Sequence, residues 1–299
     1  KIIQLMSFLK LLNYDLKSHK DIKINSLPIK IYNLNDLEQY NIIFSTKLYT
    51  NVHFCLDYED KMNDNVNNII QNARRITIEN FKNWNLFFNG NIPKYGNIPK
   101  IIYENITKLN YYGNEHIKNI ENIGTIFPNL LHLVYKSSDT SDLTEIKLNG
   151  LLKVKNIEFD CFNVNEIIFS RKLNLEDDPD DFIDIVIKNV SSETTKLDIK
   201  CDELTIDTGT IDTGKIQKLD IGILKLNNLQ IINNPPYTIP MCELLSVTNC
   251  SDFILNLSNP EALKRLFIEN TPIDFTDFKY FKKLRYLTLY NSIQLNLTD

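Results

Sequence analysis

Two stretches near the end of the chain decide the fold: Leu263-Lys-Arg-Leu-Phe-Ile-Glu-Asn-Thr271 and Leu284-Arg-Tyr-Leu-Thr-Leu-Tyr-Asn-Ser292. Each begins with leucine, follows with two variable residues, and continues with leucine, a variable residue and an aliphatic residue before ending in a small polar one. The two stretches lie 21 residues apart. A pattern that recurs at a fixed period predicts a stack of similar structural units.

The same pattern recurs toward the N-terminus at intervals of roughly 20 to 28 residues. Each unit contains two apolar residues separated by one position: Leu245/Val247, Leu219/Ile221, Leu197/Ile199, Ile185/Ile187, Ile157/Phe159, Leu133/Tyr135, Leu109/Tyr111 and Ile76/Ile78. Because side chains alternate between the faces of a β-strand, each pair predicts a short strand with an apolar inner side. One strand cannot bury that side alone, so the units must stack into a solenoid, which we predict over residues 73–299.

Two further features describe the units. A small polar residue follows several strands (Asn114, Ser138, Cys250, Thr271 and Ser292) and is of the type that hydrogen-bonds the backbone of a turn. Between residues 183 and 229, strand-like segments follow one another too closely for a helix between each pair. This crowding predicts strands on both faces of the solenoid in the middle of the chain.

The leucine pattern resembles the leucine-rich repeat, and its short, irregular units are most similar to the BspA-like type. The 39 asparagines among 299 residues are typical of an AT-rich genome. The resemblance implies an α/β solenoid, a leucine-rich-repeat superhelix with a parallel β-sheet on its concave face. Short helices, turns or extra strands would cover the convex face. It also implies a protein that binds another protein on the concave face, without catalysis or a cofactor.

In the predicted strands, the residues between the inward apolar positions face outward. The last two units contribute Arg265, Phe267, Glu269, Tyr286, Thr288 and Tyr290, and earlier units contribute Tyr112 and His132. Exposed aromatic and arginine side chains are enriched among the residues that dominate binding energy at protein interfaces. We therefore predict that these eight residues belong to a partner-binding surface.

Residues 1–72 fit the repeat poorly and are predicted to form an N-terminal cap, with a helix near residues 1–18 and irregular first strands. A cap is needed because the first strand of a solenoid would otherwise expose its core. An F-box-type module before the repeats would make the protein a substrate adaptor or a host-directed effector, and Leu27-Pro28 is compatible with the start of such a module. The chain begins with lysine, so we also expect further sequence upstream.

An enzymatic alternative comes from Asp207-Thr-Gly and Asp212-Thr-Gly, since Asp-Thr-Gly resembles the catalytic loop of aspartic proteases. That reaction needs two carboxylates on separate, symmetry-related loops that approach one another closely enough to share a proton. Asp207 and Asp212 are five residues apart in one segment, too close to supply two homologous lobes. The repeat interpretation instead places Leu204 and Ile206 inside and Gly209 at a turn.

Composition narrows the class of partner. The net charge of −5 includes no basic region for nucleic acid or for a membrane surface, and no apolar run approaches the length of a membrane span. The five cysteines are scattered without zinc-site spacing, which favours a reducing compartment. The acidic segment 175–184 has no glycine-centred calcium loop and is interpreted as a solvated insertion. We expect a cytoplasmic monomer that binds no metal.

Overall fold

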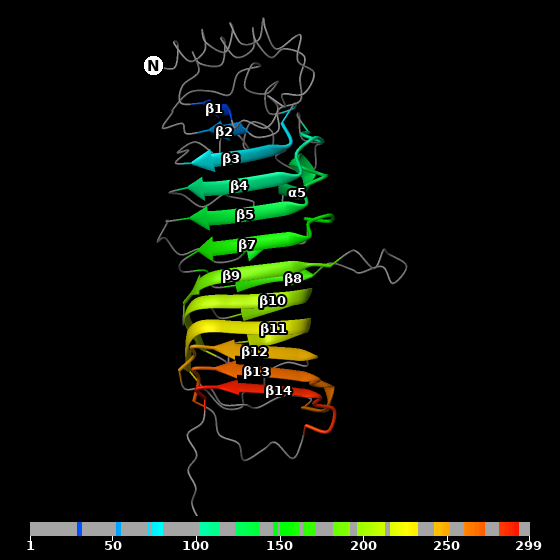
Figure 1. Ribbon diagram of the computed structural model, residues 1–299. Coiled ribbons are helices and arrows are strands. Elements are labelled where there is room, and N and C mark those ends of the chain that lie inside the picture. The colour runs from blue at the N-terminus through cyan, green and yellow to red at the C-terminus, as the bar shows by residue number, and fades with distance from the viewer. Residues whose placement is uncertain are drawn as a thin grey trace, which may run out of the picture.

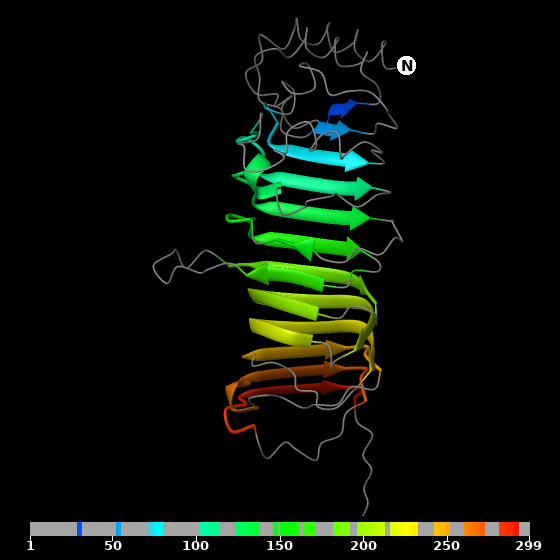
Figure 2. The same ribbon diagram turned by 180° about the vertical axis from the view of Figure 1, so that it is seen from behind.

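The computed structural model describes residues 29–31, 52–54, 71, 73–79, 102–113, 123–137, 146–148, 150–161, 164, 166–170, 182–191, 196–212, 216–232, 242–251, 260–272 and 281–292. Within these residues the chain forms a parallel β-solenoid whose strands stack in sequence order as a column (Figure 1). Figure 2 shows the same column from behind. The predicted stack of repeating units is confirmed.

The main sheet is the long parallel sheet that runs the length of the column. Its strands, in order, are β1 (Ile29–Ile31), β2 (Val52–Phe54), β3 (Arg75–Glu79), β4 (Lys108–Gly113), β5 (His132–Ser137), β7 (Asn156–Cys161), β9 (Asp184–Val190), β10 (Lys196–Asp212), β11 (Ile216–Ile232), β12 (Leu244–Thr248), β13 (Arg265–Glu269) and β14 (Tyr286–Tyr290). β1 and β2 fall within the predicted cap, and the helix expected near residues 1–18 lies outside the described residues.

Alternate side chains of the main sheet point into a continuous core, as the apolar pairs predict. In β13, for example, Leu266 and Ile268 are buried while Arg265 is exposed. Three buried aromatic rings stack across neighbouring strands: Tyr135 lies 5.1 Å from Tyr111 and 5.0 Å from Phe159, between ring centroids. Each unit therefore stabilises its neighbours through side chains at equivalent positions.

The chain turns a corner at a residue with left-handed backbone, which lies within β9, β10 and β11 and directly after β12, β13 and β14. These residues, with φ from 46° to 64°, are Asn189, Thr208, Asn228, Asn249, Asn270 and Asn291. Asparagine adopts this conformation more readily than most residues with a side chain. The last four asparagines form a ladder, in which each Nδ2 donates to the Oδ1 of the preceding one at 2.9–3.2 Å. The first of them, Asn228, donates to Asp207 Oδ1 at 2.9 Å.

The small polar residues after these corners are buried and hydrogen-bonded, as predicted for Cys250, Thr271 and Ser292. Thr271 Oγ1 accepts from the Cys250 backbone N–H at 3.0 Å and lies 2.9 Å from the Glu269 carbonyl. Ser292 Oγ lies 2.8 Å from the carbonyl of Tyr290. Asn114 and Ser138 lie outside the described residues.

Extra strands form a second face in the middle of the solenoid, as the crowded segments predict. β6 (Ile146–Lys147) pairs with β8 (Glu166–Ser170), and β8 pairs with residues 196–200 of β10. Residues 203–209 of the same strand pair with β9 in the main sheet. β10 and β11 pair along almost their full length, so both bend around one side of the column (Figures 1 and 2).

The pairing of the bent strands shows that the predicted phase of two units is wrong. Leu197/Ile199 and Leu219/Ile221 belong to the second face or its edge, while the pairs equivalent to the other units are Leu204/Ile206 and Leu224/Leu226. The error arose because each bent strand contains two alternating apolar segments, and the sequence period alone does not tell which one continues the main sheet.

The α/β class is not confirmed, because helices are nearly absent from the part of the chain that the structure describes. It contains the four-residue helix α5 (Ile123–Ile126) and the short 3-10 helix η4 (Pro260–Ala262). In the middle of the chain helices are absent from the described residues because extended strands already cover the core opposite the main sheet. No helix among the described residues is long and apolar enough to cross a membrane.

Candidate interaction surface

The candidate surface is the outer face of the main sheet, defined as the side chains that alternate with the core residues and point away from them. All eight residues predicted for partner binding belong to this face. They fall into two groups, because Tyr112 and His132 lie on β4 and β5 whereas the other six lie on β13 and β14. With a strand spacing of about 4.8 Å, roughly 30 Å separates β5 from β13. A partner that makes one compact contact therefore does not touch both groups.

The C-terminal group continues into apolar residues that are not among the eight predicted ones. Ile223 of β11 and Leu244 of β12 are in register with Arg265 and Tyr286, and all four point outward. Ile223 and Leu244 are half-buried, as is Phe267 in the next outward position of β13. We call Ile223, Leu244, Arg265, Phe267 and Tyr286 the apolar patch.

Arginine and tyrosine lie against each other within the apolar patch. The Arg265 guanidinium lies 5.3 Å from the centroid of the Tyr286 ring, a cation–π geometry. Tyr286 is 62% exposed, so one side of this pair faces solvent. The arrangement holds an aromatic ring and a cation at fixed positions beside aliphatic side chains, which limits the entropy that a partner's binding would remove.

Sequence reasoning missed Ile223 and Leu244 because the middle units were placed out of phase. The left-handed asparagines supply the signal that would have found them. Asn228, Asn249, Asn270 and Asn291 are each separated by 21 residues, and Ile223 precedes Asn228 by the same interval as Arg265 precedes Asn270. Asparagine at the corner therefore indicates the phase of a unit more reliably than an apolar pair that any strand can contain.

The middle of the outer face has a different character, since charged side chains pair with one another there. Asp160 of β7 forms an ion pair with Lys136 at 2.5 Å and accepts from Asn189 Nδ2. Lys188 Nζ lies 2.7 Å from Glu158 Oε1. Five further charged residues lie on the first halves of β10 and β11, before these strands enter the main sheet: Lys196, Asp198, Lys200, Lys218 and Asp220.

Local environment shifts the protonation of several outer-face groups. Burial and the neighbouring Lys108 lower the pKa of His132. Asp184 in β9 is in register with Glu203 in β10. Burial and the carboxylate of Glu203 raise the pKa of Asp184. For Asp160 burial works against ionisation, but hydrogen bonds from Lys136 and Asn189 outweigh it and its pKa is lowered. These shifts follow from ordinary cross-strand contacts.

The two motif aspartates, Asp207 and Asp212, lie on either side of one corner of β10. Asp207 is on the outer face, in register with Lys188 and Asn227, while Asp212 ends the strand in register with Ile232. Thr208 and Gly209 between them have φ of 64° and 114°. A β-carbon at Gly209 would lie 2.1 Å from the Val190 carbonyl oxygen, which accounts for glycine there. Leu204 and Ile206 are fully buried, as the repeat interpretation predicts.

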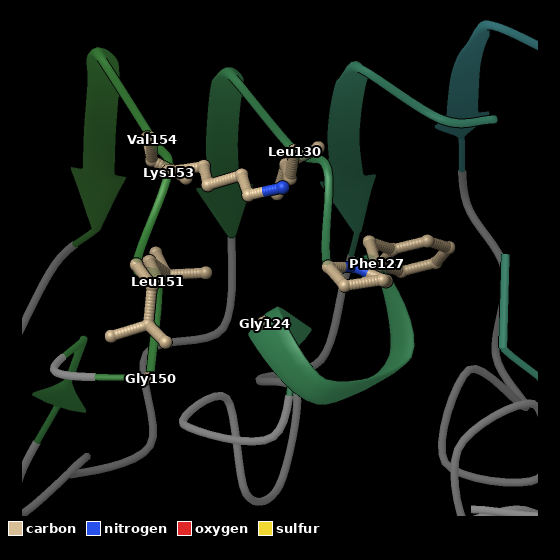
Figure 3. Close-up of a pocket in the computed structure, with 9 residues that line it drawn as sticks. Gly124, Phe127, Leu130, Gly150, Leu151, Lys153 and Val154 are labelled. Atoms are coloured by element: carbon tan, nitrogen blue, oxygen red, sulfur yellow. The ribbon is translucent and has the colours of Figure 1, made fainter. Parts of the chain in front are cut away.

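An apolar cleft of about 200 Å³ lies beside α5, away from the outer face (Figure 3). α5 with Gly124 and Phe127 forms one wall and the turn at Gly150 and Leu151 forms the other. Lys153 is the one charged residue among the described lining residues, and its Nζ donates to Asn129 Oδ1 at 2.7 Å. The cleft thus lacks the convergent polar groups that orient a small ligand.

The described cysteines and acidic residues do not assemble a metal site, since no group of three His, Cys, Asp or Glu side chains converges within the described part of the chain. Cys201, Cys242 and Cys250 are buried free thiols. Burial raises the pKa of Cys242 to about 12, so this thiol stays protonated near neutral pH. Residues 175–181 of the acidic segment lie outside the described residues, whereas Ile183 is buried and Asp184 begins β9, so the end of the segment belongs to the solenoid and not to an insertion.

Comparison with known proteins finds no relative: no family model matches the chain, and neither the curated proteins nor the solved structures contain a match.

Proposed function

We propose that the protein is a divergent leucine-rich-repeat scaffold that binds another protein through the apolar patch on β11–β14, without catalysis. The observation that carries this proposal is the continuous row formed by Ile223, Leu244, Arg265 and Tyr286 across four strands. Outward aliphatic and aromatic side chains beside an arginine have the composition of an interface centre. The ion-paired middle of the outer face has no comparable group of apolar side chains.

The leucine-rich-repeat assignment is supported by three features that occur together in the last units. Leu263 and Leu266 of η4–β13 are buried at the first and second leucine positions, and equivalent residues recur 21 positions later. Buried small polar residues follow each strand. The strands are parallel and adjacent strands follow one another in the chain.

A double variant, Leu244→Ala with Phe267→Ala, tests the binding proposal. Both side chains are half-buried and outward, so their truncation removes contact area without opening the core. We expect partner recovered by affinity capture from the native cell lysate to fall by about tenfold or more, the loss typical of a central interface residue. Variant and wild type must show the same circular dichroism.

The matched control is Val134→Ala with Val186→Ala. These valines occupy the same outward position on β5 and β9 and are also half-buried. The control should recover as much partner as the wild type. Equal recovery with the Leu244/Phe267 variant would reject the apolar patch as the binding surface, and loss with the control alone would move the surface to the earlier strands.

A further inference from the structure

Among the described residues, β14 is the last strand of the main sheet, with β13 on one side only. Its other side, the free edge, carries backbone groups that pair with no described strand. Tyr286 N–H donates to the Lys264 carbonyl and the Tyr290 carbonyl accepts from Asn270 N–H, at 3.2 and 2.9 Å. Because backbone groups alternate in direction along a strand, those of Tyr286, Thr288 and Tyr290 point toward β13. Those of Leu287 and Leu289 point the other way, toward the free edge.

This edge is apolar and uncharged. Leu287 occupies an inward position of the repeat, yet 47% of it is exposed because no described strand covers it. Tyr290 is 57% exposed. Proteins normally protect an exposed edge strand with charged residues or proline. β13 carries Arg265 and Glu269 at its two ends, whereas the five residues of β14 include no charge.

The sequence of β14 reads the same in both directions: Tyr286-Leu-Thr-Leu-Tyr290. An antiparallel pair of two copies centred on Thr288 places residue 286 opposite residue 290 and residue 287 opposite residue 289, so that Tyr286 meets Tyr290 and Leu287 meets Leu289 of the other copy. The inward leucines of both copies then lie on one side of the extended sheet and the tyrosines on the other. A two-fold symmetric interface pairs one surface with its own copy, and in this strand residues of the same type then face each other.

The direction of the backbone groups fits the same pairing. Leu287 and Leu289 point their N–H and C=O groups to the free edge, so each leucine can exchange both hydrogen bonds with its opposite residue. Thr288 then forms a pair of the non-hydrogen-bonded type, in which the two Cα atoms approach to about 4.5 Å. The same register brings Arg285 opposite Asn291, whose Oδ1 accepts no hydrogen bond from the described residues.

We propose that two copies of this chain associate edge to edge through β14, with antiparallel pairing centred on Thr288. The pairing would join the two main sheets and cover Leu287 of each copy. A strand pair alone buries less than the roughly 1,200 Å² of a stable interface, so the dimer should be weak and concentration-dependent. This dimer is proposed in addition to partner binding, and Tyr286 belongs to both surfaces. The dimer differs from the monomer expected from the sequence.

The test uses residues 1–299 in sedimentation velocity over about a hundredfold range of concentration. The wild type should rise from the monomer mass of 34.9 kDa toward twice that value. Thr288→Lys and Thr288→Glu should each stay monomeric, because a central residue meets its own copy and like charges repel at this distance. An equal mixture of the two variants should recover the dimer, since opposite charges then face each other.

Thr248→Lys is the matched control, because it adds the same charge to the same outer face on the internal strand β12 and should dimerise like the wild type. A wild type that stays monomeric throughout would overturn the proposal. So would a Thr288→Lys variant that dimerises alone, or assemblies that grow beyond two copies, which indicate head-to-tail contact. Recovery in the mixture shows that the single variants were folded.

Discussion

Asn249 shows how one residue serves both the corner and the ladder. Its left-handed backbone, with φ of 53°, turns the chain after β12, and its side chain donates to Asn228 and accepts from Asn270. Asn249→Ala should lower the free energy of unfolding by about 1–2 kcal/mol, from lost hydrogen bonds and the strain of alanine in this conformation. Urea unfolding followed by circular dichroism measures the change.

Asn249→Gly separates the two contributions, because glycine adopts the left-handed conformation without strain but has no side chain for the ladder. The glycine variant should be more stable than the alanine variant and less stable than the wild type. If alanine matched the wild type, neither the corner nor the ladder would contribute measurably to stability at this position.

Neighbouring strands place two carboxylates in opposite electrostatic environments. Their contributions to the free energy of unfolding therefore depend on pH in opposite directions. The pKa of Asp160 in β7 is lowered, so its contribution to stability is present above the ordinary value of 3.8 and is lost as the pH falls through the folded value. The pKa of Asp184 in β9 is raised, so the favourable contribution is present below 3.8 and is lost as the pH rises through the folded value.

Asp160→Asn should therefore destabilise the protein at neutral pH, by about 1 kcal/mol, and the difference from wild type should shrink in acid. Asp184→Asn should have the opposite sign at neutral pH, because it removes a carboxylate that burial and Glu203 disfavour. Denaturant unfolding at several pH values measures both. Two variants with the same sign at neutral pH would contradict this account of the pair.

At the scale of the whole molecule, the alternation of apolar and polar residues within each strand predicted more of the structure than the spacing between repeating units did. Single apolar pairs such as Leu266/Ile268 correctly identify inward residues, because a strand has only two faces. The unit to which a pair belongs is harder to predict in β10 and β11, where one strand serves two faces. The α/β class was expected from a family resemblance, and no residue pattern in the return segments required helices.

The same difficulty in assigning the phase of a unit limited the prediction of the candidate site. The outward residues of β13 and β14 were predictable because two clear repeats set their phase. Ile223 was not, because the phase of β11 depends on a bend that backbone pairing creates. Asn228 marks that bend, and asparagine was uninformative by composition in a chain so rich in it.

We expect the bent strands to determine the order in which the solenoid opens. β10 and β11 pair with each other continuously around the corner, so separating them breaks more backbone hydrogen bonds than separating β13 from β14. Native-state hydrogen exchange should be slowest in β10 and β11 and faster in β14. Uniform protection along the column would mean that the solenoid opens as one cooperative unit.

The equal spacing of the last four corners makes the units between them interchangeable. The register row Ile223, Leu244, Arg265 and Tyr286 and the corner asparagines both repeat at the same interval of 21 residues from β11 to β14. A gene that gained or lost one such interval would encode a column longer or shorter by one strand spacing, about 4.8 Å, with every corner and core position still matched. The length of this part of the molecule can therefore change during evolution in whole steps, without altering the register of the strands that remain.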